Sequence, residues 1–281
     1  MKVLIIGGTG LLGTDINAVM QGDFEVQPLG SANVDITKLD SVYHAVKTHK
    51  PDVVINSAAM ADVDKCEQEP ELAYRINAIG PKNVAIACRD YRIKMVHIST
   101  DYVFDGAKKE PYTEFDATNP LSVYGKSKLA GEELIKTVCD NHLIIRTAWL
   151  FGERRNHFVD YVVNAINNGN EIIAVKDMVS SPTYSRDTAE TIKKLISLNQ
   201  SGVFHSCNKG YCSRVELVEE IMKIMKKSAN LTVVNQSQWK KPAKRPVFSA
   251  LRNYHLSLID EDDMAGWRDA LKRYIKYKFN K

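Results

Sequence analysis

The sequence predicts an α/β fold in which a parallel sheet is doubly wound, with helices on both faces. Two observations support this prediction: short apolar runs alternate with helical patterns along the first half of the chain, and a glycine-rich turn follows the first run. Repeated βα units of this kind form a parallel sheet of the Rossmann type. The 281 residues suit one large domain, or a medium domain with a smaller one attached.

The first half of the chain gives the clearest alternation of strands and helices. Strands are expected over residues 3–6, 24–30, 52–58, 94–99 and 142–150. Helices are expected after the glycine-rich turn and over residues 35–50, 69–91 and 124–139. Pro81 lies inside the range 69–91, and because proline has no backbone N–H, we expect it to kink that helix.

The glycine-rich turn has the context of a dinucleotide site. Residues 2–13 read KVLIIGGTGLLG, with glycines at 7, 10 and 13, and Asp35 follows twenty-two residues after the last of them. We expect Gly7 to make the tight turn, Gly10 to admit a pyrophosphate, and Gly13 to let the helix pack on the strand. The helix N-terminus offers N–H groups to the phosphates. By itself the G-x-x-G-x-x-G spacing is a modest signal, since glycine-rich turns also occur in other α/β proteins.

The second half of the chain is less regular, which predicts a smaller α/β domain beside the sheet. We expect a dinucleotide-binding domain over residues 1–150 and a mainly substrate-binding domain over 151–281, with a segment of about 176–205 returning to the first. Ser213 and Glu216 match a capping box ahead of a helix that runs to residue 227. The other elements expected here are helices over 156–167, 185–198 and 260–279 and strands over 171–175, 202–207 and 231–235.

Composition narrows the class of protein. Hydrophobic residues make up 44% and charged residues 26% of the chain, as in ordinary globular proteins. The net charge of +4 is too small to favour a nucleic-acid partner, and the longest apolar runs are strand-sized, so we expect no membrane span. The five cysteines show no metal-type pairing, and a strand begins where a signal peptide would lie. We therefore expect a cytoplasmic protein without a metal site.

A second group of residues predicts reduction of a carbonyl. Tyr124 and Lys128 lie four apart in a predicted helix and therefore share a face, and Thr100 ends a predicted strand. Because ligands of doubly wound sheets bind at the carboxyl ends of strands, we expect Thr100 and Tyr124 beside a bound nicotinamide. The cofactor carries the hydride, so Tyr124 must supply the proton, and we expect the Lys128 ammonium to lower its pKa from about 10. Tyr-x-x-x-Lys also occurs by chance on helix surfaces, but the neighbouring motifs favour a catalytic pair.

Other polar residues have ordinary alternatives. His97 lies within a predicted strand, and we expect it to serve in packing. The acidic cluster of Asp62, Asp64, Glu67 and Glu69 precedes a helix, where it complements the helix dipole better than it forms a metal site. A basic loop is equally consistent with a solvated charge run and with a diphosphate site; its residues are Lys240, Lys241, Lys244 and Arg245.

Several stretches of the chain match the pattern of a known family. The most specific is Ile-Ser-Thr-Asp-Tyr-Val-Phe-Asp-Gly at residues 98–106. Other matching stretches are residues 54–59, 63–67, 111–114, 120–128, 146–149, 151–152, 181–183 and 245–251. Together they resemble the dTDP-4-dehydrorhamnose reductases, in the extended branch of the short-chain dehydrogenase/reductase superfamily. This resemblance covers nearly the whole chain and implies reduction of the 4-keto group of a nucleotide-linked deoxysugar, in particular of dTDP-4-dehydro-L-rhamnose to dTDP-L-rhamnose.

The resemblance also implies roles for individual residues. Tyr124 is implied as the proton donor, Lys128 as its partner and ribose contact, and Thr100 as the residue that tunes the donor. The residues implied to line the cofactor site, besides Tyr124 and Lys128, are Gly7, Thr9, Gly10, Leu11, Leu12, Gly13, Asp35, Ile36, Ala58, Ala59 and Met60. Those implied to face the substrate are Thr100, Asp101, Tyr102, Trp149 and, near the diphosphate, Arg245. The family includes dimers, so the resemblance is compatible with a homodimer.

The chain departs from the family pattern at several positions. Leu11 stands where the family often has Gln, Ala148 replaces a common Ser, and residues 177–183 read Asp-Met-Val-Ser-Ser-Pro-Thr instead of Asp-Gln-x-Gly-Ser-Pro-Thr. These changes leave the reductase chemistry intact and the identity of the sugar open. The second strand ends at Leu29-Gly30-Ser31, without an acid for a ribose 2′-hydroxyl or an arginine for a 2′-phosphate. We therefore expect both NADPH and NADH to serve.

Two other functions remain open from the residues alone. A nucleotide-sugar epimerase or 4,6-dehydratase uses the same fold, but dehydratases usually carry Asp-Glu after the threonine, where this chain has Asp101 and Tyr102. A non-catalytic, NADP-binding regulatory subunit that resembles the β subunit of methionine adenosyltransferase is the other alternative. The intact set of Thr100, Tyr124 and Lys128 favours the enzyme.

Overall fold

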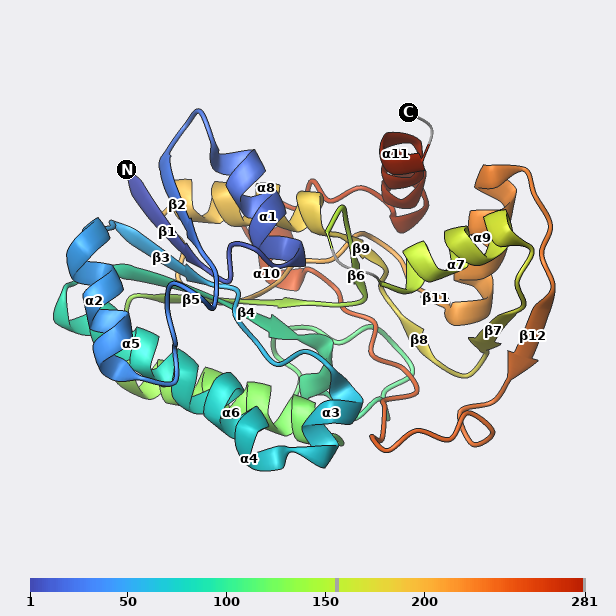
Figure 1. Cartoon of the computed structure of the whole chain (residues 1–281), viewed down its shortest axis with the longest axis horizontal. Coiled ribbons are helices and arrows are strands. Elements are labelled where there is room, and N and C mark those ends of the chain that lie inside the picture. The colour runs from blue at the N-terminus through green and yellow to red at the C-terminus, as the bar shows by residue number, and fades with distance from the viewer. Residues whose placement is uncertain (155–156, 280–281) are drawn as a thin grey trace.

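The computed structural model describes residues 1–154 and 157–279. Within these residues a central parallel sheet has the strand order β10-β5-β4-β3-β1-β2 (Figure 1). Its strands are β1 (Lys2–Ile6), β2 (Glu25–Leu29), β3 (Val53–Asn56), β4 (Lys94–Thr100), β5 (His142–Thr147) and β10 (Gly202–His205). The order reverses beside β1, as in a doubly wound sheet, and the predicted fold class is confirmed.

Helices cover both faces of this sheet (Figure 1). One face carries α2 (Leu39–His49), α5 (Gly80–Asp90) and α6 (Val123–Val138), and the other carries α1 (Leu11–Met20) and α8 (Ser185–Ser197). Apolar side chains from both helix layers pack on the strands, which explains why the strands are almost continuously hydrophobic. Helix α8 packs on α1, and β10 pairs with β5, so residues from the second half of the chain complete this core.

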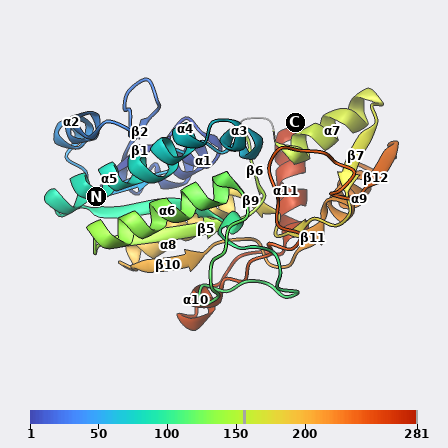
Figure 2. The ribbon, with the colours of Figure 1, turned by 90° about the horizontal axis from the view of Figure 1, so that it is seen from below.

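A smaller layer, which we call the cap, lies beside the carboxyl ends of the strands (Figures 1 and 2). It consists of α7 (Phe158–Asn168), α9 (Arg214–Met225) and α11 (Trp267–Phe279), which surround their own hydrophobic core. Short strand pairs complete it: β6 (Leu150–Phe151) with β9 (Thr183–Tyr184), β7 (Ile172–Val175) with β12 (Leu231–Val234), and β8 (Val179–Ser180) with β11 (Cys212–Ser213). The short helix α10 (Tyr254–Leu258) lies against β10.

The helix expected over residues 69–91 is interrupted. The structure divides this region into α4 (Pro70–Tyr74), a π-helical turn η1 (Arg75–Ile79) and α5, and a separate helix, α3 (Val63–Gln68), precedes it. Pro81 lies in the first turn of α5 and cannot donate a backbone hydrogen bond, and the N–H of Gly80 bonds the carbonyl of Arg75. The break therefore takes the form of a π-turn before Pro81 in place of the kink expected at Pro81 itself.

Two other helices begin later than expected. The expected helix 35–50 starts only at Leu39, because the Asp35 carboxylate accepts hydrogen bonds from the backbone and hydroxyl of Thr37 and forms a turn. The expected helix 260–279 starts only at Trp267, since Asp260 has a left-handed backbone (φ 57°) and Glu261 pairs with Lys194 of α8.

The helix expected from Asn156 begins at Phe158, and Asn156 itself lies outside the described residues. The capping box of Ser213 and Glu216 is present at the start of α9, as expected. No helix in the described ranges is long and apolar enough to cross a membrane.

Candidate active site

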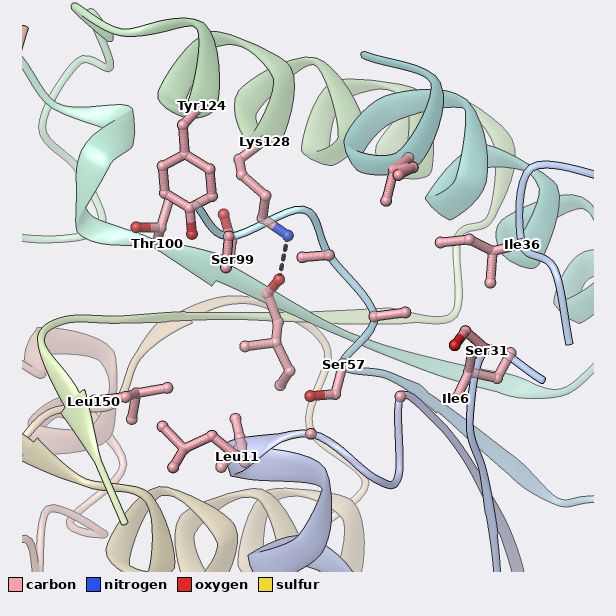
Figure 3. Close-up of a pocket in the computed structure, with 18 of the residues that line it drawn as sticks. Ile6, Leu11, Ser31, Ile36, Ser57, Ser99, Thr100, Tyr124, Lys128 and Leu150 are labelled. Carbon is pink, nitrogen blue, oxygen red and sulfur yellow. Dashed lines mark hydrogen bonds between the residues drawn. The ribbon is translucent and has the colours of Figure 1, made fainter. Parts of the chain in front are cut away.

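A cavity of about 940 Å³ opens along the carboxyl ends of β1, β3 and β4 (Figure 3). The predicted cofactor residues that line it are Gly7, Thr9, Gly10, Leu11, Leu12, Asp35, Ile36, Ala58, Ala59, Tyr124 and Lys128. The predicted substrate residues that line it are Thr100, Asp101 and Trp149. Gly13, Met60, Tyr102 and Arg245 lie outside its lining. One cavity therefore joins the glycine turn to Thr100, Tyr124 and Lys128, which we call the reactive group.

The glycine turn is shaped for a close backbone approach. Gly7 has a left-handed backbone (φ 82°), and a Cβ there would come within 2.6 Å of the Ala58 nitrogen. A Cβ on Gly13 would come within 2.2 Å of the Gly7 carbonyl oxygen, so Gly13 is needed for packing α1 on the turn and not for lining the cavity. Gly10 precedes α1 without a side-chain cap and faces the cavity, which leaves the helix N-terminus available to a phosphate. These residues fit a dinucleotide.

At the far end of the cavity the predicted Asp35 and Ser31 lie with two residues that the sequence analysis did not single out, Thr37 and Arg75. Asp35 lines it beside Thr37, and hydrogen bonds from Thr37 hold the pKa of the Asp35 carboxyl below its usual value. Ser31 and Arg75 also line the cavity. Arg75 comes from the π-turn, which no local pattern in the sequence predicts.

Tyr124 reaches the end of β4 because α6 packs closely there. Ser122 caps the helix by accepting from the N–H of Gly125, and a Cβ on Gly125 would collide with the Tyr102 carbonyl oxygen at 2.1 Å. The ring of Tyr124 packs edge-on against Tyr102 with 5.7 Å between centroids. Figure 3 shows Tyr124 and Lys128 side by side on α6, with the Tyr124 ring beside Thr100 and the Lys128 side chain pointing toward the end of β4 near Ser99.

The pKa of Tyr124 differs from the expectation. Burial raises the pKa of this phenol well above its usual value, and a hydrogen bond with the Thr100 hydroxyl acts in the opposite direction. The predicted lowering of this pKa by Lys128 is wrong, because desolvation of the phenolate outweighs the favourable interactions around it. The predicted residues are brought together, whereas the pKa of Tyr124 shifts in the opposite direction to the prediction.

Lys128 is buried against β4. Its Nζ donates to the carbonyl oxygen of Ile98 at 2.5 Å and lies 3.1 Å from Nε2 of His97. Burial lowers the pKa of Lys128 to about 8. His97 is fully buried, as its expected packing role requires, but it also contacts this lysine. Strand alternation places His97 on the same face as Ser99, which bonds Glu132 of α6, and this alternation is the signal that could have revealed the contact.

Asp101 connects the end of β4 to the cap. Its Oδ2 accepts hydrogen bonds from Ser249 at 2.5 Å and Ser180 at 3.1 Å, and its Oδ1 accepts from Thr100 at 3.1 Å. Burial raises the pKa of Asp101 to about 6, although these hydrogen bonds lower it. Through the two serines Asp101 holds β8 and the loop at Ser249 beside Thr100, a role for Asp101 that the sequence analysis missed.

Two arginines lie on the cap side. The guanidinium of Arg214 stacks on the ring of Trp149 at 3.5 Å and on Phe158 at 4.4 Å, a cluster that the sequence analysis did not identify. Arg245 donates to Asp64 at 2.8 Å and stacks on Trp239. The guanidinium expected near a diphosphate is therefore engaged with an acid of the 62–69 cluster.

The remaining acids of that cluster are also engaged in structural contacts. Asp62 caps α3 by accepting from the N–H of Lys65, and Glu67 accepts from the N–H of Val123 at the start of α6. Glu69 pairs with Lys65 at 3.7 Å on the exposed surface. Within the part of the chain that the structure describes, no three His, Cys, Asp or Glu side chains are grouped so that they could hold a metal ion.

The fold and the group of Thr100, Tyr124 and Lys128 define an extended short-chain dehydrogenase/reductase. The family described as RmlD substrate binding domain matches residues 1–279. The chain is 36% identical over 278 residues to the spore coat polysaccharide biosynthesis protein SpsK of Bacillus subtilis, covering 98% of this chain and 97% of that protein.

Two solved structures are similar over almost their whole length. A dTDP-4-dehydrorhamnose reductase from Clostridium acetobutylicum gives a TM-score of 0.95 at 43% identity, covering 99% of each chain. The same enzyme from Bacillus anthracis, solved in complex with NADP, gives a TM-score of 0.96 at 35% identity, covering 98% of this chain and 99% of that one. The chain belongs to the dTDP-4-dehydrorhamnose reductase family.

Proposed function

We propose that the protein uses NADPH or NADH to reduce the 4-keto group of a dTDP-linked deoxysugar, with dTDP-4-dehydro-L-rhamnose as the substrate and dTDP-L-rhamnose as the product. The observation that supports this function best is the single cavity that joins the glycine turn to Tyr124, Lys128 and Thr100. The substrate class is supported by the names of relatives and similar structures.

Each polar residue of the reactive group has a separate task in this proposal. A bound nicotinamide supplies the hydride. Tyr124 donates a proton from its phenol to the carbonyl oxygen of the sugar, and Thr100 hydrogen-bonds the phenol and orients it. Lys128 holds the ribose and stands beside Tyr124 on the same helix face. Because the raised pKa of Tyr124 keeps the phenol protonated at neutral pH, the resting enzyme is ready to donate in the direction of reduction.

The substrate would occupy the space between the strand ends and the cap. We assign Asp101, Tyr102 and Trp149 to the sugar side, and Arg245 to the loop that borders the diphosphate. Residues 1–150 then bind the dinucleotide and most of 151–281 binds the sugar nucleotide, with about 176–205 completing the first domain. The contacts of Asp101 with Ser180 and Ser249 support this division, because they hold cap loops against the reactive end of β4.

The proposed tolerance of both cofactors rests on the loop after β2. Ser31 lines the cavity there, and this position provides neither an acid nor an arginine. Steady-state kinetics with NADPH and with NADH tests the proposal. A preference of more than ~10³-fold in kcat/KM for one cofactor, equivalent to about 4 kcal/mol, would contradict the proposed tolerance.

We also propose a cytoplasmic location and leave a homodimer as a prediction from the resemblance. All five cysteines are free and buried, which supports a reducing compartment. Sedimentation velocity of the purified chain measures its oligomeric state directly, and a monomer at all concentrations would contradict the dimer.

The decisive experiment is turnover with a panel of 4-keto nucleotide sugars. We expect oxidation of NADPH with the dTDP-linked 6-deoxy sugar, and a product two hydrogen atoms heavier by mass spectrometry. The variant Tyr124→Phe serves as the control for background oxidation. Tight cofactor binding without turnover of any sugar would favour the regulatory-subunit alternative.

A further inference from the structure

Beneath the cavity, three buried side chains form a line of contacts that ends at Lys128. Asn56 of β3 and His97 of β4 are paired across the sheet, and Asn56 Nδ2 lies 3.2 Å from His97 Nδ1. His97 Nε2 lies in turn 3.1 Å from Lys128 Nζ. Asn56 and His97 are fully buried and Lys128 is 2% exposed, so the protein alone supplies the hydrogen-bonding partners of the imidazole.

The orientation of the Asn56 amide decides where the proton of His97 lies. The Oδ1 atom of Asn56 accepts from the N–H of Ala58 at 3.2 Å, so its NH₂ group is the one that faces the ring. An NH₂ group only donates, and Nδ1 must therefore accept and carry no proton. Burial holds the pKa of His97 well below its usual value, so the ring is neutral and its single proton lies on Nε2.

This tautomer directs an N–H donor at Lys128. An ammonium has three donors and no acceptor, so it cannot accept a hydrogen bond from the Nε2–H of His97. A neutral amine can accept this hydrogen bond and still donate one to the carbonyl oxygen of Ile98. We propose that Asn56 and His97 are positioning residues that fix this tautomer and thereby favour the neutral amine of Lys128, so that the lysine exchanges its proton near neutral pH.

Burial and several neighbouring groups also act on the charge of Lys128. Glu132 and Tyr124 face it from the same helix, His97 faces it from β4, and Arg75 and Asp101 line the same cavity. Glu132 raises the pKa of Lys128, but its carboxylate is bound by Arg146 of β5 at 2.7 Å and by Ser99. The pKa of about 8 thus reflects burial acting against Glu132, and the His97 donor acts in the same direction as burial.

The consequence for catalysis rests on the proposed reductase function. After Tyr124 has given its proton to the sugar oxygen, the phenolate must be protonated again. The Lys128 ammonium supplies that proton and becomes an amine, which then takes a proton from solvent. A lysine held permanently charged would return this proton slowly, because efficient transfer requires a pKa near the working pH.

The first test measures protonation directly and needs no activity. We would label histidine nitrogens and the lysine Cε carbons and record NMR spectra across the neutral pH range, with His97→Gln identifying the His97 signals. We expect a neutral His97 protonated on Nε2. A wild-type His97 protonated on Nδ1, or on both nitrogens, would overturn the proposal.

The second test switches the tautomer. In Asn56→Asp a carboxylate replaces the NH₂ donor, so the imidazole proton moves to Nδ1 and Nε2 becomes an acceptor for the ammonium. We expect the pKa of Lys128, followed through its Cε signal, to rise by about one unit or more. The alkaline limb of the plot of kcat against pH should shift to higher pH by a similar amount. In His97→Gln the side-chain carbonyl can accept from the ammonium, so the same upward shift is expected by an independent change.

Asn141→Asp is the matched control. It makes the same substitution just before β5, where Asn141 accepts from Lys94 at the opposite edge of the sheet. We expect this variant to leave unchanged both the pKa of Lys128 and the pH at which kcat falls on the alkaline side. A switched tautomer in Asn56→Asp with an unchanged Lys128 pKa overturns the proposal. If the wild-type protein turns over no sugar, the proposed function fails, whereas the two titrations still decide the roles of Asn56 and His97.

Discussion

The sheet half of the molecule and the cap present their functional residues in different ways. On the sheet side, the glycine turn, Thr100 and the Tyr124–Lys128 pair lie at a strand end or on one helix face, and all of them line one cavity. On the cap side, Trp149 and Arg245 lie in loops. Arg214 stacks on Trp149, and Asp64 of the sheet half binds Arg245. The comparison teaches that the proposed reactive residues are placed by local patterns of the sequence, whereas the proposed substrate side depends on long-range pairing.

Three side-chain contacts between the halves involve carboxylates of the sheet half. Ser180 and Ser249 bind Asp101, and Arg245 binds Asp64. Each of these contacts joins a cap segment, either β8 or a loop, to a carboxylate of the sheet half. Substitutions on the two sides should therefore differ in kind: those on the sheet side should reduce turnover or cofactor affinity, and those at the contacts should change stability.

The largest effect is expected for Tyr124→Phe. Loss of the proton donor should lower kcat by at least ~10², whereas cofactor affinity should change little because the ring still fills its place beside Tyr102. Single-turnover kinetics and a fluorescence titration with NADPH measure the two quantities. A near-wild-type kcat would mean that the proton comes from another group.

The next largest effect is expected for Gly10→Val. A side chain in front of the α1 N-terminus blocks the pyrophosphate, and NADPH affinity should fall by between ~10- and ~10²-fold, equivalent to about 1.4–2.7 kcal/mol. Gly266→Val is the matched control: Gly266 immediately precedes α11, and its Cβ would meet nothing closer than 4.0 Å. Unchanged affinity in Gly10→Val would contradict the role given to the glycine turn.

Asp101 should make the contact with the cap sensitive to pH. Its folded-state pKa of about 6 lies above the usual 3.8, so the protonated form is favoured on folding, and this stabilisation is lost as the pH rises from about 4 to about 6. Asp101→Asn removes the titration, so over this window the variant should gain about 1–3 kcal/mol relative to wild type. Urea unfolding of both proteins at several pH values measures the difference, and a constant difference would count against the assignment.

The smallest effect is expected for Asp64→Asn. Weakening the partly buried bond to Arg245 should lower the free energy of unfolding by about 1–2 kcal/mol. Glu69→Gln removes the exposed pair with Lys65 on the same helix and should cost less than ~0.5 kcal/mol. If the two variants lose equal stability, the Arg245 contact does not hold the cap more firmly than an ordinary surface pair.

The same contrast explains what the sequence could predict. The doubly wound sheet and the set of Thr100, Tyr124 and Lys128 follow from strand alternation, glycine spacing and the four-residue period of a helix. Ser180 and Ser249 lie 79 and 148 residues from Asp101, and no local pattern encodes such a pairing. The pKa of Tyr124 was beyond the sequence for another reason: the sign of its shift depends on how completely the phenol is desolvated.

The π-turn and the late start of α11 show a similar limit. Pro81 indicates that the helix ladder must be broken, but the place of the break depends on which backbone groups find partners, such as the bond from Gly80 to Arg75. The acids at 260–263 resemble the first turn of a helix, yet Glu261 pairs with Lys194 of a distant helix instead. At the start of α11 a tertiary contact overrode a correct local tendency, whereas in the π-turn the choice lay between local backbone partners.

The return of the chain to the sheet limits how this scaffold can be recombined. Truncation after residue 150 would remove β10 and α8. It would leave β5 as an unpaired edge strand and expose the apolar face of α1, and both changes favour aggregation. A donor cap from another enzyme therefore cannot be grafted at a single junction. The exchange would need two replaced segments, one before and one after residues 185–205. Residues 185–205 of the host would be retained, because they complete its sheet and helix layer.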